Sequence, residues 1–346
     1  MNRRLYLVAA AALAVIAGVS VYVATTVKPK DIAQTGDLTV IEDSVPSVTA
    51  AKGWINSPPL TRADLAGKVV LYDFWTYSCI NCQRTLPHLK GLYDRYKGDG
   101  LVIIGVHSPE FDFEKDHGNV ARAVEHYGVT WPVALDDDMA IWNAFGNQYW
   151  PAEYLTDRDG RLRQVRFGEG DYDSKEDDVR TLLGLPATAP RAPAAGADQV
   201  VTAALTPEIH FGLLFGGASL SASPEPLTAG TGTYSLPDPV PQDRFALSGS
   251  WTTTDQGIET GGSISALVLR YQGAEVNLVA GAAADAAAPI DVTVELDGAP
   301  LTTLTVMEHD LYQVVSNGPA GYHTLTFRPR ASGLQAFAFT FGAGTR

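Results

Sequence analysis

The chain has 346 residues, which exceeds the usual size of one domain, so two folded domains with sizeable cores are expected. Its formal net charge is −14, and no dense cluster of Lys and Arg supplies the basic face that a phosphate backbone requires. These features exclude nucleic acid as the expected partner. The acidity favours solubility.

The N-terminus carries two arginines followed by an uncharged apolar run over residues 5–27, which is long enough to span a bilayer. A secretory signal peptide has a shorter apolar region, and Tyr22 stands where cleavage after Ala24 would need a small residue. We therefore expect residues 1–29 to form an uncleaved membrane anchor and residues 30–45 a stalk. A cleaved signal segment is the alternative. Both interpretations place the remainder outside the cytoplasm.

The two cysteines of the chain follow a change of pattern. Residues 69–75 form an apolar, β-branched run, which is typical of a strand buried on both faces. Leucines and tyrosines then recur at helical spacing, which predicts a helix over residues 79–96. Cys79 would lie at the start of that helix, where unpaired N–H groups and the helix dipole favour a thiolate. We predict that Cys79 is a nucleophile and that Cys82 is the resolving thiol.

Three other interpretations of the cysteine pair remain. A structural disulfide closing so short a loop would contribute only about 2 kcal/mol of unfolded-state entropy. A zinc site would need two more ligands, and His88 is the only candidate nearby in the sequence. The cysteines could also be inert core residues, since free cysteine is often a small buried side chain.

The elements that follow indicate an α/β domain. Strands are predicted over 101–106, 153–156 and 161–167, and helices over 120–127, 139–145 and 174–184. The acidic loop 107–116 is interpreted as solvated, with Phe111 and Phe113 turned inward, rather than as a calcium site. Asp136, Asp137 and Asp138 are interpreted as an N-cap for the helix that follows.

Residues 186–199 are rich in Pro and Ala, a composition that predicts an extended linker. Beyond it the hydrophobic period becomes two, most clearly over 290–298, 324–327 and 337–341. Short strands separated by turn residues predict an antiparallel, jelly-roll-like β-sandwich over residues 200–346. No helical pattern stands out there.

The segment Asp73-Phe74-Trp75-Thr76-x-x-Cys79-x-x-Cys82, followed by Pro87, resembles the active-site segment of the thioredoxin superfamily. Within it, residues 75–82 resemble the DipZ-type subgroup of the TlpA-like thioredoxins. The resemblance extends to residues 148–155, where this family places a cis-proline loop opposite the cysteines. It covers about residues 46–185 and implies a thioredoxin-like fold there.

The resemblance also implies roles for particular residues. Asp73 would lie buried beneath the thiols and move the proton of Cys82, although a purely structural carboxylate is the alternative. Pro151 would be the cis-proline that pairs with client backbone, with Pro132 as a rival position. Trp75, Tyr77, Ile80, Asn81 and Trp150 would line the client groove around it. The family uses no cofactor beyond the redox-active Cys79–Cys82 disulfide, and no metal.

Two departures from the wider thioredoxin pattern leave the redox direction open. Ser78 stands where tryptophan often precedes the first cysteine, and Ile80-Asn81 replace Gly-Pro between the thiols. Trp150 is also bulkier than the usual residue before the proline, which would narrow the groove. Because extracytoplasmic TlpA-like proteins are mostly reductive, the resemblance favours a reductase.

Strings in the second half resemble the carbohydrate-module-like C-terminal domain of DipZ-type proteins, namely residues 206–208, 247–251, 310–315 and 336–342. Sugar binding would need exposed aromatic rings, for which Trp251, Tyr271 and Tyr312 are the candidates. Most aromatic residues of a sandwich belong to its core, so a spacer or docking module for protein partners is favoured over carbohydrate binding.

Together these features predict a membrane-anchored thiol-disulfide oxidoreductase of the bacterial cell envelope that reduces disulfide-bearing client proteins. The full DipZ architecture includes a multi-span electron-carrying region, so the expected electron donor is a separate membrane thiol reductase of the CcdA/DsbD type. A thiol peroxidase is one alternative, although no threonine and arginine arrangement surrounds Tyr77-Ser78. The other is a cell-surface protein whose β-sandwich binds sugar or protein.

Overall fold

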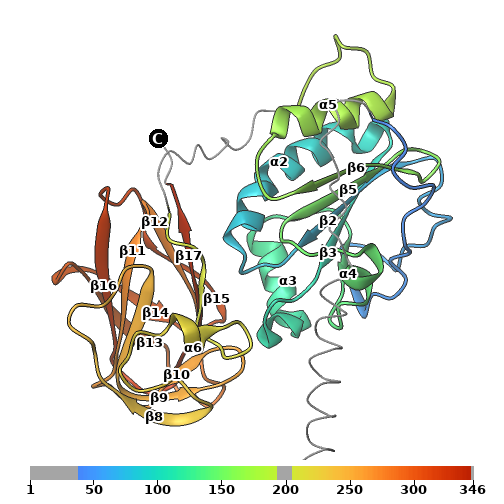
Figure 1. Cartoon of the computed structure of the whole chain (residues 1–346). Helices are drawn as coiled ribbons and strands as arrows, with labels where there is room; N and C mark the ends of the chain where they lie inside the picture. Colours follow the sequence, from blue (N-terminus) through green and yellow to red (C-terminus); the bar gives the residue numbers. More distant parts are fainter. Residues whose placement is uncertain (1–37, 193–204, 344–346) are drawn as a thin grey trace, which may run out of the picture. The chain divides into compact units, whose positions relative to one another are not determined.

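The structure, a computed structural model, describes residues 38–192 and 205–343 (Figure 1). The predicted anchor over residues 1–29 and the first part of the predicted stalk lie outside this range. Among the described residues, no helix has both the length and the apolar character needed to cross a bilayer.

The first domain is built on a six-stranded sheet. Its strand order is β1 (Gly53–Ile55), β4 (Val133–Leu135), β3 (Leu101–His107), β2 (Val69–Trp75), β5 (Ala152–Thr156) and β6 (Leu162–Phe167). Strand β2 pairs in parallel with β3 and antiparallel with β5, so it lies in the middle of the sheet. All its residues are buried. The buried strand predicted from the apolar run over residues 69–75 is confirmed.

Helices cover both faces of this sheet (Figure 1). They are α2 (Ile80–Tyr96), α3 (His117–His126), α4 (Ala140–Phe145) and α5 (Tyr172–Leu183). Two short 3₁₀ helices accompany them: η1 (Lys97–Asp99) follows α2, and η2 (Asp112–Lys115) precedes α3. Side chains of α2, α3 and α5 share one core with Leu71 of β2. Helix α4 packs on the other face, where Phe145 contacts Tyr72 and Phe74. The thioredoxin-like α/β fold is confirmed.

Two helices begin earlier than predicted, each for a local reason. Helix α3 begins at His117 because the Asp116 carboxylate accepts hydrogen bonds from the N–H groups of Gly118 (2.8 Å) and Asn119 (3.0 Å). Helix α5 begins at Tyr172, directly after Asp171, whose φ of 55° ends the preceding turn. The N-cap of helix α4 is Met139 rather than one of the three predicted aspartates, but Asp136 accepts hydrogen bonds from the N–H groups of Ile141 and Trp142 in the first turn.

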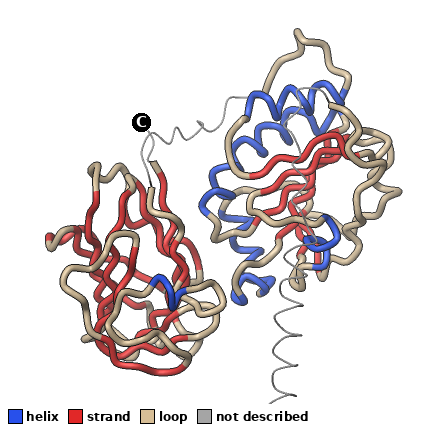
Figure 2. Tube along the Cα trace, in the orientation of Figure 1, coloured by secondary structure: helices blue, strands red, loops and turns tan. Residues whose placement is uncertain are grey.

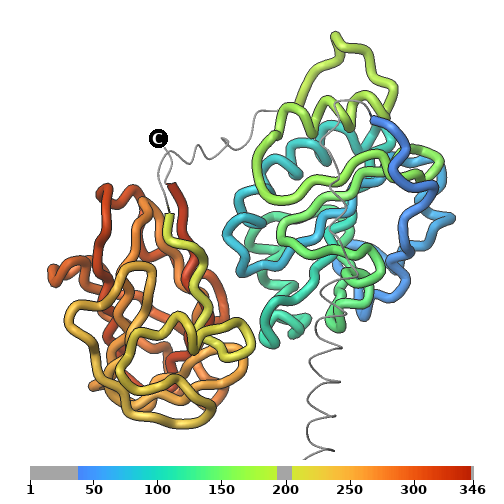
Figure 3. The backbone as a smooth tube through the Cα atoms, viewed as in Figure 1, coloured from blue at the N-terminus to red at the C-terminus, as the bar shows by residue number. Residues whose placement is uncertain are grey.

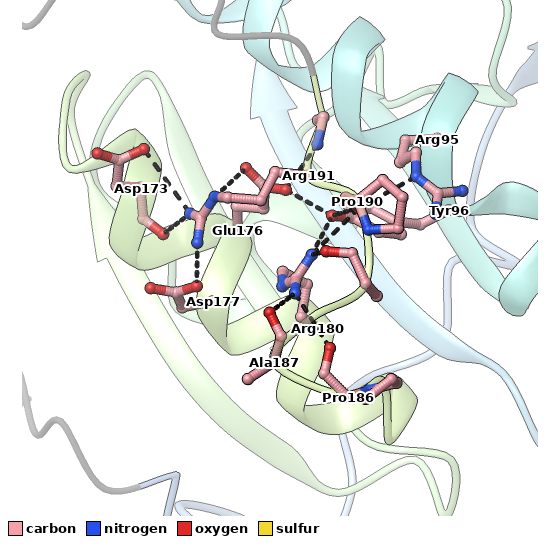
Figure 4. Close-up of polar contacts among 12 residues, drawn as sticks. Arg95, Tyr96, Asp173, Glu176, Asp177, Arg180, Pro186, Ala187, Pro190 and Arg191 are labelled. Atoms are coloured by element: carbon pink, nitrogen blue, oxygen red, sulfur yellow. Dashed lines mark hydrogen bonds and ion pairs between the residues drawn. The ribbon is translucent and has the colours of Figure 1, made fainter.

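The first residues of the Pro/Ala-rich segment are bound to the first domain (Figure 4). The guanidinium of Arg180 on α5 donates hydrogen bonds to the carbonyl oxygens of Pro186, Ala187, Ala189 and Pro190. Arg191 binds the carboxylates of Asp173, Glu176 and Asp177. Composition alone does not predict that residues 186–191 are held in place, because the polar groups that bind them belong to the preceding helix, α5. Residues 193–199 of the predicted linker lie outside the described range.

The second domain is mostly β, as predicted (Figure 2). Its strands are β7 (Ile209–His210), β8 (Gly230–Tyr234), β9 (Arg244–Thr253), β10 (Ile258–Thr260), β11 (Ala266–Gln272), β12 (Glu275–Ala282), β13 (Ile290–Leu296), β14 (Ala299–Val306), β15 (Asp310–Val315), β16 (Tyr322–Pro329) and β17 (Leu334–Gly342). The strand path runs β14-β13-β16-β11-β9-β10-β17-β12-β15, and its two end strands contact each other, so the sheet nearly closes. One turn of helix, α6 (Gly217–Leu220), was not predicted.

Two strands hold this β domain together. The first half of β9 pairs with β11, and its second half pairs with β10 and β8. Strand β17 pairs with β10, β12 and β7. Figure 3 shows the start and the end of this domain, β7 and β17, running side by side in yellow and red.

Two of the aromatic residues considered for sugar binding belong to the core of the β domain. Trp251 and Tyr271 are fully buried, so neither can stack on a sugar. Tyr312 is partly buried, and its hydroxyl donates to the backbone oxygen of Glu308 at 2.7 Å. Trp251 and Tyr271 are therefore excluded as candidates for sugar binding, because their rings fill the space between the strands, as is expected of most aromatic residues in a sandwich.

The acidic loop that follows β3 packs against the β domain, and both domains belong to one unit, Leu38–Arg346. Phe111 and Phe113 turn away from solvent, as predicted, but they contact Phe337 of β17, with ring centroids 5.4 and 4.7 Å away. Phe111 is 1% exposed. The loop is therefore solvated only in part. Asp112, Lys115 and Asp116 are exposed, as predicted, whereas Glu114 is buried and the two phenylalanines form a small core with β17.

Candidate active site

The cysteine pair lies at the start of helix α2. Cys79 is the N-cap residue, with extended backbone angles, and its Sγ accepts a hydrogen bond from the N–H of Cys82 at 3.3 Å. Cys79 is partly exposed, whereas Cys82 is 0% exposed, and both are free thiols. Burial raises the pKa of Cys82, and the neighbouring Cys79 raises it further. The pair therefore combines one accessible sulfur on a helix N-terminus with one buried thiol that holds its proton.

Asp73 lies on the central strand β2 and is 0% exposed. Burial raises its pKa well above the usual range, the charge of Glu153 raises it further, and Lys175 opposes both effects. Neither carboxyl oxygen has a hydrogen-bond partner among the described residues. The Asp73 carboxyl also acts electrostatically on the Cys82 thiol, whose pKa it raises. The buried position that the resemblance implied for Asp73 is thus present.

A buried ion pair accompanies Asp73, and it was not predicted. Glu153 stands directly opposite Asp73 in the pairing of β5 with β2. Its Oε1 lies 2.8 Å from Nζ of Lys175 on α5, and the two side chains are 5% and 4% exposed. Lys175 precedes Val179 by four residues, so helical spacing places it on the same inward face. That spacing was the available signal, but a lysine is rarely expected in a core.

Trp75 and Tyr77 do not line a client groove, contrary to the prediction. Trp75 is 1% exposed and Tyr77 is 2% exposed. Tyr77 stacks on His107 and donates from its hydroxyl to the backbone oxygen of His309, at 3.2 Å. Trp75 approaches Gly105 so closely that a Cβ there would lie 2.9 Å from the indole Nε1. Trp75 is the last residue of the fully buried strand β2, and Tyr77 follows it by two residues. Both rings therefore pack in the core beneath the cysteine turn.

Glu114 also supports the cysteine turn, from the loop after β3. It is 0% exposed, and its carboxylate accepts hydrogen bonds from Ser78 Oγ (2.6 Å) and from the N–H groups of Glu110 (2.6 Å) and Phe111 (3.0 Å). Burial, assisted by the charge of Glu110, raises its pKa to about 7. The burial of Glu114 is not evident from the local sequence, because the partner that packs on this loop lies more than 200 residues away, at Phe337.

Three of the predicted groove residues do surround Cys79. Ile80, Asn81 and Trp150 line a pocket of about 210 Å³ that also contains the sulfur-bearing side chain. Trp150 is fixed by its indole N–H, which donates to the backbone oxygen of Ser108 at 3.0 Å. The remaining lining residues, among them Glu110, Glu208 and Thr340, come from the loop after β3 and from the β domain.

Pro151 follows Trp150 in a cis peptide bond and is buried. Among the described residues, the only other cis bond precedes Pro239, so the rival position Pro132 is trans. The residue after the cis proline, Ala152, begins β5, which pairs with the strand that leads into the cysteine turn. The structure thus places Cys79 and Trp150 at one pocket, Asp73 within electrostatic range of Cys82, and Pro151 directly after Trp150. The roles of these residues in the reaction stay predictions.

Comparisons with known proteins agree with this geometry. The AhpC/TSA family matches residues 41–165, and the family described as thioredoxin like C-terminal domain matches residues 206–342. Protein DipZ of Mycobacterium bovis is 39% identical over 310 residues, which cover 86% of this chain and 43% of DipZ. The chain thus spans less than half the length of DipZ.

Two further matches each cover 41% of this chain. A solved structure of a thioredoxin-like protein in its oxidised form is 32% identical, with a TM-score of 0.39, over 41% of this chain and 96% of its own. Thiol-disulfide oxidoreductase YkuV of Bacillus subtilis is 32% identical over 144 residues, which cover 41% of this chain and 96% of YkuV. With YkuV covered almost entirely, the chain belongs to the family of thioredoxin-like thiol-disulfide oxidoreductases.

Proposed function

We propose that this chain is an extracytoplasmic, membrane-anchored enzyme that reduces disulfides in exported proteins through Cys79 and Cys82. The observation that carries the proposal is the asymmetry of the pair. Cys79 is reachable and its sulfur accepts the N–H of Cys82, whereas Cys82 is buried and its pKa is raised. An accessible thiolate can attack first, and a protected thiol can wait until a mixed disulfide has formed.

In the proposed reaction, the Cys79 thiolate attacks one sulfur of the client disulfide. The client S–S bond breaks, a mixed disulfide forms at Cys79, and one client thiolate leaves. Cys82 then attacks the Cys79 sulfur, which releases the second client thiolate and leaves a Cys79–Cys82 disulfide. The client gains two electrons and the protein loses two. A membrane thiol reductase of the CcdA/DsbD type restores the dithiol in this proposal.

Asp73 acts in the second step of this proposal, because Cys82 must lose its proton before it can attack. A carboxylate whose pKa is raised by burial is a stronger base than one in water, so the ionised form of Asp73 is suited to accept that proton. Glu153 and Lys175 adjust this basicity in opposite directions. Asp73 therefore serves as the base for Cys82.

Residues 1–29 hold the protein at the membrane in this proposal, and the apolar run over residues 5–27 supports it. The β domain, interpreted as a jelly-roll-like sandwich, serves as a docking module for protein partners. Its buried Trp251 and Tyr271 favour this role over carbohydrate binding.

A thiol peroxidase remains the second candidate, because the AhpC/TSA family matches residues 41–165. Peroxide reduction needs an arginine near the reactive thiol. Arg84, the arginine of helix α2 closest in sequence to the cysteines, is bound to Glu169 at 3.2 Å and to Glu275 at 2.6 Å. An arginine held by two carboxylates is poorly placed to stabilise a peroxide, so the geometry favours disulfide chemistry.

The proposed function is tested by trapping. We expect the variant Cys82→Ser to accumulate mixed disulfides through Cys79, while the matched variant Cys79→Ser, which keeps the other thiol, accumulates none. Titration of the purified chain with reduced and oxidised dithiothreitol should give one two-electron Cys79–Cys82 transition. The proposal fails if no disulfide forms at any ratio. Rapid sulfenate formation at Cys79 with peroxide, without reaction with protein disulfides, would support the peroxidase instead.

A further inference from the structure

The β domain supplies one wall of the pocket that contains Cys79. Val279 of β12 and Thr340 of β17 line it, and so does Glu208, which precedes β7. Because strands β12 and β17 are paired with each other, and β17 also pairs with β7, these three positions belong to one continuous surface. The opposite wall is the cysteine turn with Ile80 and Asn81.

Polar contacts fix this wall against the cysteine helix. Arg84 of α2 lies 2.6 Å from a carboxylate oxygen of Glu275, at the start of β12, and the two side chains are 16% and 11% exposed. On the other side of the turn, the Tyr77 hydroxyl donates to the backbone oxygen of His309. A client that reaches Cys79 through the pocket therefore meets the β domain as well as the thioredoxin-like domain.

The lining of the pocket is acidic. Glu110 and Glu208 both line it, and no Lys or Arg does so among the described residues. Glu110 lies 2.9 Å from Nε2 of His210, which offsets its charge when that imidazole is protonated. Burial in the pocket and the charge of Glu110 raise the pKa of Glu208 to about 7, and His210 opposes this effect. Glu208 makes no hydrogen bond with a described residue, so above about pH 7 its charged carboxylate is available to a bound group.

Thr340 also lines the pocket, beside Glu208. Thr340 is 6% exposed, and its Oγ1 is a buried oxygen without a hydrogen-bond partner among the described residues. Because this oxygen is itself buried, the hydroxyl lies behind the surface of the wall. The charged group that the β domain presents to whatever approaches Cys79 is therefore the carboxylate of Glu208.

We propose that this pocket selects disulfides flanked by cationic groups, and that Glu208 is the residue that determines this selectivity. The inference rests on the proposed function, because it concerns which disulfides the Cys79 thiolate attacks. A cationic group beside the disulfide is attracted by Glu208 as the sulfur approaches, and an anionic group is repelled. The chemistry is the two-step exchange given above, with two electrons passing from the dithiol to the disulfide.

Two small disulfides that differ in charge test this proposal. The purified full-length chain is reduced, freed of reductant and mixed at about pH 8, where Glu208 is mostly ionised, with cystamine, which is dicationic, or with dithiodiglycolate, which is dianionic. The rate constant for loss of the Cys79 thiol is measured by acid quenching and mass spectrometry. The ratio of the two rate constants is the informative quantity, because any effect on the intrinsic reactivity of Cys79 cancels in it.

We expect cystamine to react faster, and Glu208→Gln to lower the ratio about fivefold, which corresponds to about 1 kcal/mol for one partly solvated charge. Asp285→Asn, which removes an exposed charge from a loop of the same domain, should leave the ratio unchanged. In the unmodified protein, raising the ionic strength should also reduce the ratio, since salt screens exposed charges. This measurement tests the charge argument even if the Gln variant does not fold.

The outcomes separate the two proposals. If neither disulfide reacts with the reduced protein, the proposed function is wrong. If both react at similar rates, or if the ratio is unchanged by salt, the protein exchanges disulfides but the charge selectivity is refuted. A large ratio that Glu208→Gln leaves intact, in a variant that folds, refutes the role of Glu208.

Discussion

The buried ion pair of Glu153 and Lys175 is expected to contribute strongly to the stability of the protein beneath the cysteine turn. In the variant Lys175→Met, the aliphatic part of the side chain remains but the ammonium group is lost. Glu153 then keeps a carboxylate that is 5% exposed and has lost its cation, directly opposite Asp73 on the paired strand. The Asp73 carboxyl becomes harder to ionise, because the cation that lowered its pKa is gone.

Removing one partner of a buried ion pair costs about 3–5 kcal/mol, because an uncompensated charge stays in the core. We expect Lys175→Met to lower the free energy of unfolding by about this amount, measured by urea denaturation. Replacing both partners by apolar residues of similar volume is often neutral, so the double variant Lys175→Met/Glu153→Leu should recover most of the loss. The double variant is therefore the matched control.

If Lys175→Met lowers the free energy of unfolding by less than about 1 kcal/mol, the proposed contribution of the ion pair is refuted, since water cannot replace a partner this deeply buried at so small a cost. It is also refuted if the double variant is no more stable than the single one. In that case the loss would come from packing at α5 rather than from the unpaired carboxylate of Glu153.

Three other predictions follow from the residues around the cysteine turn. Gly105→Ala should destabilise the protein by about 1–3 kcal/mol in urea, because the new Cβ lies 2.9 Å from Trp75 Nε1; unchanged stability would contradict the close approach. Asp73→Asn should lengthen the life of the mixed disulfide at Cys79 about 100-fold in quenched-flow assays, and an unchanged lifetime would remove Asp73 as the base. Glu114 has its pKa raised from 4.5 to about 7, so the folded state holds that proton more tightly and is stabilised below about pH 4.5. This stabilisation is lost as the pH rises from about 4.5 through 7. Over this range the free energy of unfolding, measured in urea, should fall by about 3 kcal/mol more in the natural protein than in Glu114→Gln. Parallel pH profiles of the two proteins would refute the raised pKa of Glu114.

Most of the thioredoxin-like domain could be predicted, because its signals are local. The apolar run of β2 and the helical spacing after Cys79 gave correct elements. Cys79, Cys82, Asp73 and Pro151 were found through the motif that carries the resemblance, and the structure places them as that motif implies. Their roles in the reaction remain proposals.

The support of the site could not be predicted, because it depends on contacts distant in the sequence. Glu114 and Lys175 have the composition of surface charges, but the loop of Glu114 packs against the β domain, and Lys175 points from α5 toward Glu153 of β5. Trp75 and Tyr77 were predicted to line the groove because the motif places them next to the cysteines in the sequence, but the motif does not show how deeply their side chains are buried. The sequence pattern of a strand shows which residues point to the same face of the sheet, but it does not show whether another domain covers that face.

The pairing of β7 with β17 has a consequence for biosynthesis. His210 pairs with Ala338, so the β domain cannot complete its sheet until almost the whole chain has left the ribosome. At about 5–20 residues per second, the thioredoxin-like domain is finished several seconds before that strand exists. During this interval the newborn chain carries a formed cysteine turn with nothing opposite it, and a set of unpaired strand edges that invite association.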